Sequence, residues 1–193
     1  MLIAFRPLSR GVSLIELCIA LAIFTVLLVM AVPSFSIWVS NSKIRATAEA
    51  IHNGLQLARA AAVQRNAVVR FQLTSSLSGG CALSAIDSNW VVSLDDPSGA
   101  CANTPSDTVA PRIIQSRPAA EGSGNTVVAA GQSAIAFNGL GRQVAIGGAA
   151  LANVVINISN ATVGTRPLRV MVSTEGQTRM CDPALLSSDP QGC

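Results

Sequence analysis

The chain has 193 residues, of which 50% are hydrophobic and 4% aromatic, and its formal net charge at pH 7 is +3. This length accommodates one domain and an appendage. The sequence has a single histidine, His52, and no C-x-x-C pair, so it lacks the ligand spacing of a zinc site. We therefore expect no metal and no cofactor.

The first predicted element is an apolar helix near the N-terminus. Glu16 is followed by a hydrophobic run to Val32, and no other charge occurs between residues 17 and 42. A run of this length is typical of a helix that spans a bilayer. An acidic side chain at the centre of a bilayer costs roughly 2.5–3.5 kcal/mol. Arg6 and Arg10 precede the run, which favours a cytoplasmic N-terminal end.

Pro33-Ser34-Phe35-Ser36 is a poor signal-peptide cleavage site, so the apolar segment is not interpreted as an ordinary signal peptide. The spacing of the apolar residues that follow predicts that the helix continues as an amphipathic one. A helix from Ser13 to Gln64 would be about 78 Å long at 1.5 Å per residue. We expect Pro33 to kink or loosen this helix. Gly54 is either a second weak point of the helix or a place of close packing. Apolar residues recur at steps of three and four in its second half, at Ile44, Ala48, Ile51, Leu55, Ala58 and Ala62.

The N-terminus has the spacing of a class III signal, formed by Gly11, Val12, Glu16 and Pro33. In this the N-terminus resembles type IV pilins and type II secretion pseudopilins. The resemblance implies that a prepilin peptidase cuts between Gly11 and Val12 and methylates the new N-terminus. Glu16 then becomes the fifth residue of the mature chain. The family usually has Phe where this chain has Val12, which leaves the efficiency of methylation open.

Glu16 has two explanations, which are compatible with each other. Ser13 and Glu16 match the S-x-x-E capping box, in which both side chains satisfy free N–H groups at a helix start. The resemblance implies that Glu16 also pairs with the α-amine of Val12 on a neighbouring subunit. Neutralising both charges in a low dielectric would then select the register of assembly.

Beyond Asn66, short β-prone runs alternate with Gly, Pro, Asn and Asp. A helix followed by antiparallel strands indicates an α+β fold, here a pilin-like one with a long N-terminal helix packed on a β-sheet domain. Asn138-Gly139 and Glu175-Gly176 are hairpin signals. The predicted strands are Val68–Leu73, Trp90–Leu94, Arg112–Gln115, Thr126–Ala129, Ala134–Phe137, Asn153–Ile158 and Leu168–Ser173.

Of the five cysteines, Cys18 lies in the apolar run and the other four lie in the β-prone region. Four cysteines can pair in three ways. We prefer the sequence-local pairing, Cys81 with Cys101 and Cys181 with Cys193, in which each bridge would stabilise the fold by about 3 kcal/mol. Disulfides indicate an oxidising compartment, whereas the alternative is four reduced, buried thiols.

A second resemblance is carried by residues 54–66, Val68-Val69-Arg70-Phe71, Asn89-Trp90-Val91-Val92, residues 137–142 and residues 172–183. In these segments the chain after the apolar helix is similar to the GspH/FimT group of pilin-like proteins. The similarity extends over nearly the whole chain from Gly11 onward.

The sequence does not favour an enzyme. His52 has no plausible nucleophile beside it, and Asp95-Asp96 is interpreted as two acids that solvate a loop. Gly139-x-Gly141 lacks the third glycine and the strand–helix context of a dinucleotide motif.

DNA binding is a more serious alternative than catalysis. Some FimT-type minor pilins are DNA receptors that use arginines of a C-terminal G-R-x-R motif. Here the stretch reads Gly176-Gln177-Thr178-Arg179, so only the second arginine is kept. Arg142, Arg166 and Arg169 would join Arg179 in a basic patch for phosphates. Against this, removing Arg6 and Arg10 from the 13 Lys/Arg leaves 11, against 10 Asp/Glu.

We interpret the chain as a minor pilin that helps prime a type IV pilus and is incorporated at or near its tip. The alternatives are a type II secretion pseudopilin and a DNA-binding minor pilin of natural transformation. The resemblance implies other minor pilins, the major pilin, a prepilin peptidase, an inner-membrane assembly platform and membrane lipid as partners. The expected divisions are a leader (1–11), a transmembrane and filament-core helix (12–39), an amphipathic helix (40–66) and a periplasmic β-rich domain (67–193).

Overall fold

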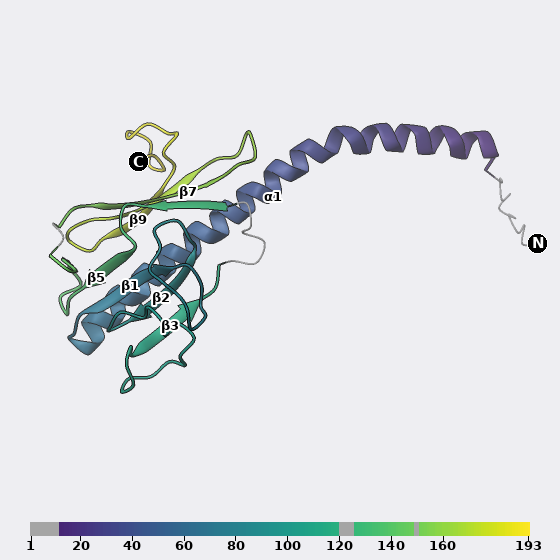
Figure 1. Cartoon of the computed structure of the whole chain (residues 1–193). Coiled ribbons are helices and arrows are strands. Elements are labelled where there is room, and N and C mark those ends of the chain that lie inside the picture. Colours follow the sequence, from purple (N-terminus) through teal and green to yellow (C-terminus); the bar gives the residue numbers. More distant parts are fainter. Residues whose placement is uncertain (1–11, 120–125, 149–150) are drawn as a thin grey trace, which may run out of the picture. The chain divides into compact units, whose positions relative to one another are not determined.

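The computed structural model describes residues 12–119, 126–148 and 151–193, without the side chains of residues 29–33. It divides into two compact units, one that ends at Ser36 and one that comprises Ile37–Cys193. Helix α1, Leu14–Arg65, contributes to both (Figure 1). These bounds agree within one residue with the predicted helix, and the helical backbone continues through Pro33.

Both ends of α1 are capped by local hydrogen bonds. At the start, the Glu16 N–H donates to Ser13 Oγ over 3.2 Å, which is the serine half of the predicted capping box. At the end, Asn66 adopts a left-handed conformation with φ of 46°. The Asn66 and Ala67 N–H groups donate to the carbonyls of Val63 and Ala62, the pattern of a Schellman motif.

The second unit contains two antiparallel sheets that lie against the second part of α1 (Figure 1). The five-stranded sheet has the order β3-β2-β1-β5-β6, formed by Ile113–Arg117, Asn89–Ser93, Val69–Thr74, Ala134–Phe137 and Gln143–Val144. The four-stranded sheet has the order β4-β7-β8-β9, formed by Thr126–Ala130, Val154–Asn160, Leu168–Val172 and Thr178–Cys181.

The α+β prediction is confirmed, and every predicted strand is present within two residues of its expected bounds. Strands β6 and β9 were not predicted. β6 has only two residues, and β9 reads Thr-Arg-Met-Cys, which carries no strong β signal by itself. β9 is a strand because it continues the hairpin after Glu175-Gly176, with Arg179 opposite Met171 on β8.

One hydrophobic core joins α1 to both sheets. The predicted apolar face of α1 is fully buried, which confirms the helical periodicity. Each buried Leu or Ile side chain contributes about 1.5–3 kcal/mol relative to an exposed one. The face packs on residues of both sheets, among them Phe71, Trp90, Phe137, Ile156 and Val170.

The four cysteines of the β-rich unit form two disulfides, Cys81–Cys101 and Cys181–Cys193, which is the sequence-local pairing. The first lies in a small second core with Val91 and Ile113, beneath the loop between β2 and β3. The second closes the C-terminal segment onto the end of β9. Cys18 is an exposed free cysteine.

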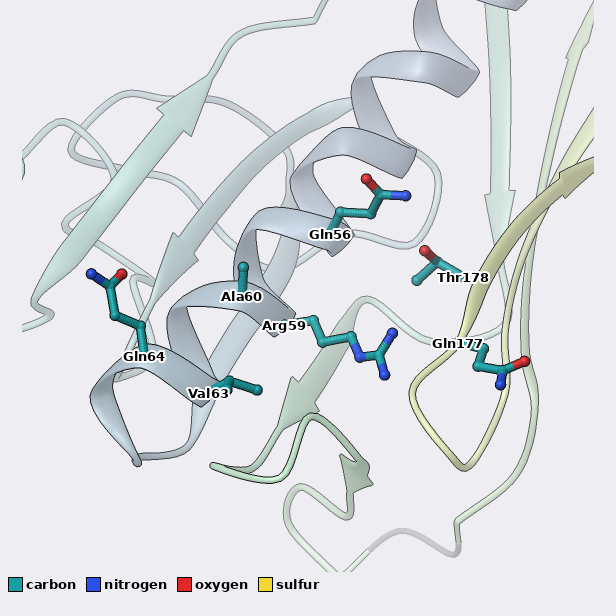
Figure 2. Close-up of a pocket in the computed structure, with 7 residues that line it drawn as sticks. All are labelled: Gln56, Arg59, Ala60, Val63, Gln64, Gln177 and Thr178. Atoms are coloured by element: carbon teal, nitrogen blue, oxygen red, sulfur yellow. The ribbon is translucent and has the colours of Figure 1, made fainter.

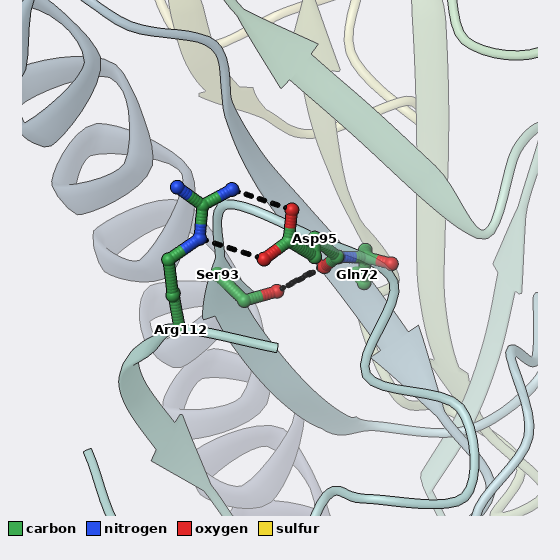
Figure 3. Close-up of polar contacts among 4 residues, drawn as sticks. All are labelled: Gln72, Ser93, Asp95 and Arg112. Carbon is green, nitrogen blue, oxygen red and sulfur yellow. Dashed lines mark hydrogen bonds and ion pairs between the residues drawn. The ribbon is translucent and has the colours of Figure 1, made fainter. Parts of the chain in front are cut away.

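The loop between β2 and β3 is held by an ion pair rather than only solvated. The Arg112 guanidinium donates to both oxygens of the Asp95 carboxylate, over 2.8 and 2.6 Å (Figure 3). The buried Gln72 amide donates to Ser93 Oγ over 3.0 Å and to the Asp95 carbonyl over 3.1 Å. This corrects the interpretation of Asp95, whose side chain closes the base of the loop.

Candidate assembly surface

The first unit presents an apolar surface on every side of the helix. Its large hydrophobic side chains from Val12 to Leu28 are about half exposed or more. A helix that is hydrophobic all round is one that other chains or lipid bury. None of the helical stretches whose residues are described reaches the length and hydropathy that a membrane crossing requires.

Glu16 is the one acidic residue on this surface. Its backbone N–H is occupied by Ser13, but within the described residues its carboxylate has no hydrogen-bond partner. An ionised carboxylate only accepts hydrogen bonds, so a partner of Glu16 would have to be a donor. Gly11 and the remainder of the expected leader lie outside the described residues, and Val12 is exposed.

Three of the four candidate DNA-binding arginines have polar partners within the chain. Arg166 forms an ion pair of 2.8 Å with the buried carboxylate of Asp182. Two further bonds are made by guanidinium groups: Arg169 donates to Asn157 Oδ1 over 2.8 Å, and Arg179 donates to the Gly192 carbonyl over 2.8 Å.

The four arginines also lie at different places on the β-rich unit. Arg169 pairs with Cys181 and Arg179 pairs with Met171, so both arginines are on the outward face of the β8–β9 hairpin. Arg166 precedes β8, whereas Arg142 packs against Gly176 in the turn that follows it. The fold therefore brings Arg169 and Arg179 together but separates Arg142 from Arg166 by the length of β8.

A hollow of about 750 Å³ lies between α1 and the start of β9 (Figure 2). Among the described residues that line it, the one charged group is the Arg59 guanidinium, whose Nε donates to the Gly141 carbonyl over 3.0 Å. The sequence alone did not indicate it, because its two sides are far apart in the chain: Gln56, Arg59, Ala60, Val63 and Gln64 from α1, and Gln177 and Thr178.

A long N-terminal helix, apolar in its first part and packed on antiparallel sheets in its second, defines a pilin-like protein. The family model for the type II transport protein GspH matches residues 47–176, well over half of the chain. The chain therefore belongs to the GspH family. The prokaryotic N-terminal methylation motif matches residues 6–32, which include Gly11, Val12 and Glu16.

Among solved structures, the chain is similar to the type IV minor pilin FimU of Pseudomonas aeruginosa. One crystal form matches with a TM-score of 0.51 and 14% identity, covering 79% of this chain and 96% of that chain. A second crystal form gives a TM-score of 0.47 and 13% identity, covering 77% of this chain and 98% of that chain. At this identity the first match shows the fold alone. A search of curated proteins found no match.

Proposed function

We propose that this GspH-family chain is a minor pilin that helps prime assembly of a type IV pilus and becomes part of it. The observation that carries the proposal is the exposed apolar helix surface from Val12 to Leu28, on which Glu16 is the only acid. A surface of this kind is buried either by lipid or by equivalent helices. A filament subunit is surrounded first by lipid, before assembly, and then by equivalent helices in the filament.

The proposed mechanism is polymerisation. A prepilin peptidase removes residues 1–11 and methylates Val12, and the helix then holds the subunit in the inner membrane as a single-pass protein with its β-rich unit in the periplasm. The assembly platform moves the subunit into the pilus, where the helix packs on those of the other minor pilins and the major pilin.

In the filament, Glu16 accepts hydrogen bonds from the α-amine of Val12 on a neighbouring subunit. Opposite charges attract more strongly in a low dielectric than in water. Leaving one of them buried without its partner costs several kcal/mol, on the order of 3–5. Subunits with Glu16 and Val12 out of register are therefore disfavoured, which makes this pair a selector of register.

The test compares Glu16→Ala with Glu49→Ala in the native host, using immunoblots of membrane and sheared-pilus fractions. Glu49 is an exposed acid of the same helix in the second unit, ion-paired with Arg45 over 3.5 Å. We expect both variants to be processed and only Glu16→Ala to be lost from the pilus fraction. Normal incorporation of Glu16→Ala would contradict the proposal and leave Glu16 as a capping residue.

A type II secretion pseudopilin is the nearest alternative, because the matching family model describes a transport protein of that system. Deleting the gene and measuring both pilus number and secretion separates the two. A DNA receptor is less well supported, since Arg166, Arg169 and Arg179 already have partners within the chain. Salt-sensitive gel shifts that disappear in Arg179→Gln would favour that alternative instead.

A further inference from the structure

The hollow between α1 and the start of β9 holds one cation in a fixed position. Arg59 Nε donates to the Gly141 carbonyl over 3.0 Å. The other two guanidinium nitrogens, Nη1 and Nη2, have no hydrogen-bond or ion-pair partner among the described residues. Figure 2 shows the guanidinium extending from α1 into the hollow, on the side of Gln177. Arg59 therefore presents two unpaired nitrogen donors to whatever enters the hollow.

The carbonyl that holds Arg59 belongs to a turn that is packed tightly on both sides. Gly141 has a φ of 72°, and a Cβ there would lie 3.0 Å from Arg59 Nε. On the other side, Gly176 lies directly against the Gly141 carbonyl and has no room for a side chain. Asn138 Oδ1 accepts hydrogen bonds from two N–H groups of the turn, each over 3.0 Å. The position of the Arg59 guanidinium is thus set before any partner binds.

Within the described part of the chain, no acid pairs with Arg59. The other described residues that line the hollow are all uncharged. Glu175 is the acid closest in sequence to the β9 side of the hollow, and its carboxylate accepts a hydrogen bond from Thr174 Oγ1 over 2.9 Å. That bond lowers the pKa of Glu175, and the charge of Arg142 lowers it further. Glu175 is therefore associated with Arg142, and the hollow keeps the positive charge of Arg59.

This arrangement suits a single carboxylate. A guanidinium binds a carboxylate through two parallel N–H···O hydrogen bonds, which are stronger than bonds between neutral groups. The Thr178 hydroxyl, on the opposite wall, can donate to a remaining lone pair. DNA is less suited, because its affinity comes from several phosphates that are neutralised together, whereas Arg59 is the one cation among the described lining residues.

The carboxylate is supplied more readily by a different protein than by a second copy of this chain. Every acid that the structure describes in the second unit already accepts a hydrogen bond or forms an ion pair within the chain. An acid that left such a partner to reach Arg59 would exchange one contact for another, so a second copy gains little by binding here.

We propose that the hollow receives an Asp or Glu side chain of a neighbouring pilin subunit of different sequence, whose carboxylate pairs with Arg59 Nη1 and Nη2. This rests on the proposed function, because only a filament subunit has such neighbours. The hollow is open to a side chain from outside, since the residues that border it on α1 are exposed: Gln56, Ala60, Val63 and Gln64. The pair adds a contact at the second unit to the contact between apolar helices.

The experiment uses photo-crosslinking of the full chain in pili of the native host. The photoreactive amino acid p-benzoylphenylalanine replaces Gln64, which borders the hollow with its side chain directed away from Arg59 (Figure 2). As the matched control it replaces Ile86, which is 73% exposed in the loop between β1 and β2. Mass spectrometry identifies the peptide that each position captures.

Three variants test the role of Arg59 in this capture. Arg59→Gln removes the charge, and Arg59→Glu inverts it. Gln56→Glu leaves Arg59 and its bond to Gly141 in place but supplies a carboxylate at the i, i+3 spacing, at which side chains of one helix meet. Because Gln56→Glu keeps the packing around the hollow, a loss of capture in that variant is not explained by misfolding.

We expect residue 64 to capture a peptide of another pilin subunit that contains Asp or Glu. The yield should fall about fivefold in Arg59→Gln and in Gln56→Glu, which is the upper range for a partly exposed ion pair. Capture at residue 86 should not change. Replacing the captured acid by Arg in the partner should restore the yield in Arg59→Glu.

Other results would overturn the proposal. Capture of a peptide without an acid, or a yield that neither Arg59→Gln nor Gln56→Glu lowers, would show that the hollow does not bind a carboxylate. Capture of this same chain, or of DNA, would assign the hollow to a second copy or to nucleic acid. If the chain is in the pili but residue 64 captures nothing, the proposed function stands and the site fails. If the chain is absent from the pili, both fail.

Discussion

Gly54 of α1 lies directly against the ring of Phe71: a Cβ at residue 54 would be 2.6 Å from Phe71 Cε2 and 3.0 Å from Trp90 Cε2. The two rings are themselves in contact, with centroids 5.7 Å apart. Glycine here is therefore not a weak point of the helix. It allows α1 to approach the five-stranded sheet closely enough to bury both aromatic side chains.

Gly54→Ala is expected to destabilise the protein. In an exposed helix this change stabilises by roughly 0.5–1 kcal/mol. At residue 54 the overpacking against Phe71 and Trp90 costs about 1–3 kcal/mol and outweighs that gain. Urea unfolding should show a lower midpoint for Gly54→Ala. Gly79→Ala is the control, because a Cβ there has nothing within 4 Å, and an equal shift in both variants would refute the packing argument.

The ion pair between Asp95 and Arg112 is expected to make stability depend on pH in the acid range. The hydrogen bonds from Arg112 lower the pKa of the Asp95 carboxyl below its usual 3.8. A lowered carboxyl pKa means that its stabilisation is present above about pH 4 and is lost as pH falls through the folded-state pKa.

The Asp95→Asn variant should therefore unfold at lower urea than the parent at pH 7, and the difference should shrink at pH 3. Both side chains are more than a third exposed, so the effect is modest, about 1 kcal/mol or less. A double-mutant cycle with Arg112→Gln should show that the two losses are not additive. Additive losses, or a difference that persists at pH 3, would speak against the pair.

Loss of the Cys181–Cys193 disulfide is expected to release the C-terminal segment. The segment is also held by the bond from Arg179 to the Gly192 carbonyl and by the bond from the Asp182 N–H to the Gln191 carbonyl, but each such hydrogen bond is worth only about 1 kcal/mol. The disulfide closes a 12-residue separation, for which the loop-entropy model gives about 3 kcal/mol. Cys193→Ser should open residues 183–193 to limited proteolysis, whereas Cys18→Ser should not. Unchanged protease resistance would show that the hydrogen bonds suffice.

The intact mass of protein from the native host tests the processing site. We expect a chain that begins at methylated Val12 and has four half-cystines oxidised. Gly11→Ala should block cleavage, because the resemblance assigns the cut to the bond after this glycine. A mature chain that retains Met1, or one cut near Pro33, would contradict the prepilin interpretation.

The local patterns of the sequence were sufficient for α1 and for every strand except β6 and β9. The period of Ile44, Ala48 and Ile51 identified the buried face of α1, because helical geometry alone places residues three and four apart on one side. Strands were recognisable where β-branched and aromatic residues lie between turn signals. The short loops between paired cysteines made the disulfide pairing foreseeable as well.

Other features depend on contacts between distant parts of the chain. The sequence alone indicated the apolar N-terminal helix with its lone Glu16 and the α+β order, and it favoured the sequence-local cysteine pairing, since each follows from residues close together. Only the tertiary structure decided that Gly54 packs on Phe71, that Asp182 and Gly192 occupy Arg166 and Arg179, and that the β7–β8 loop fastens to α1. The reason is physical: these contacts are selected by the burial of the whole core and not by any local propensity.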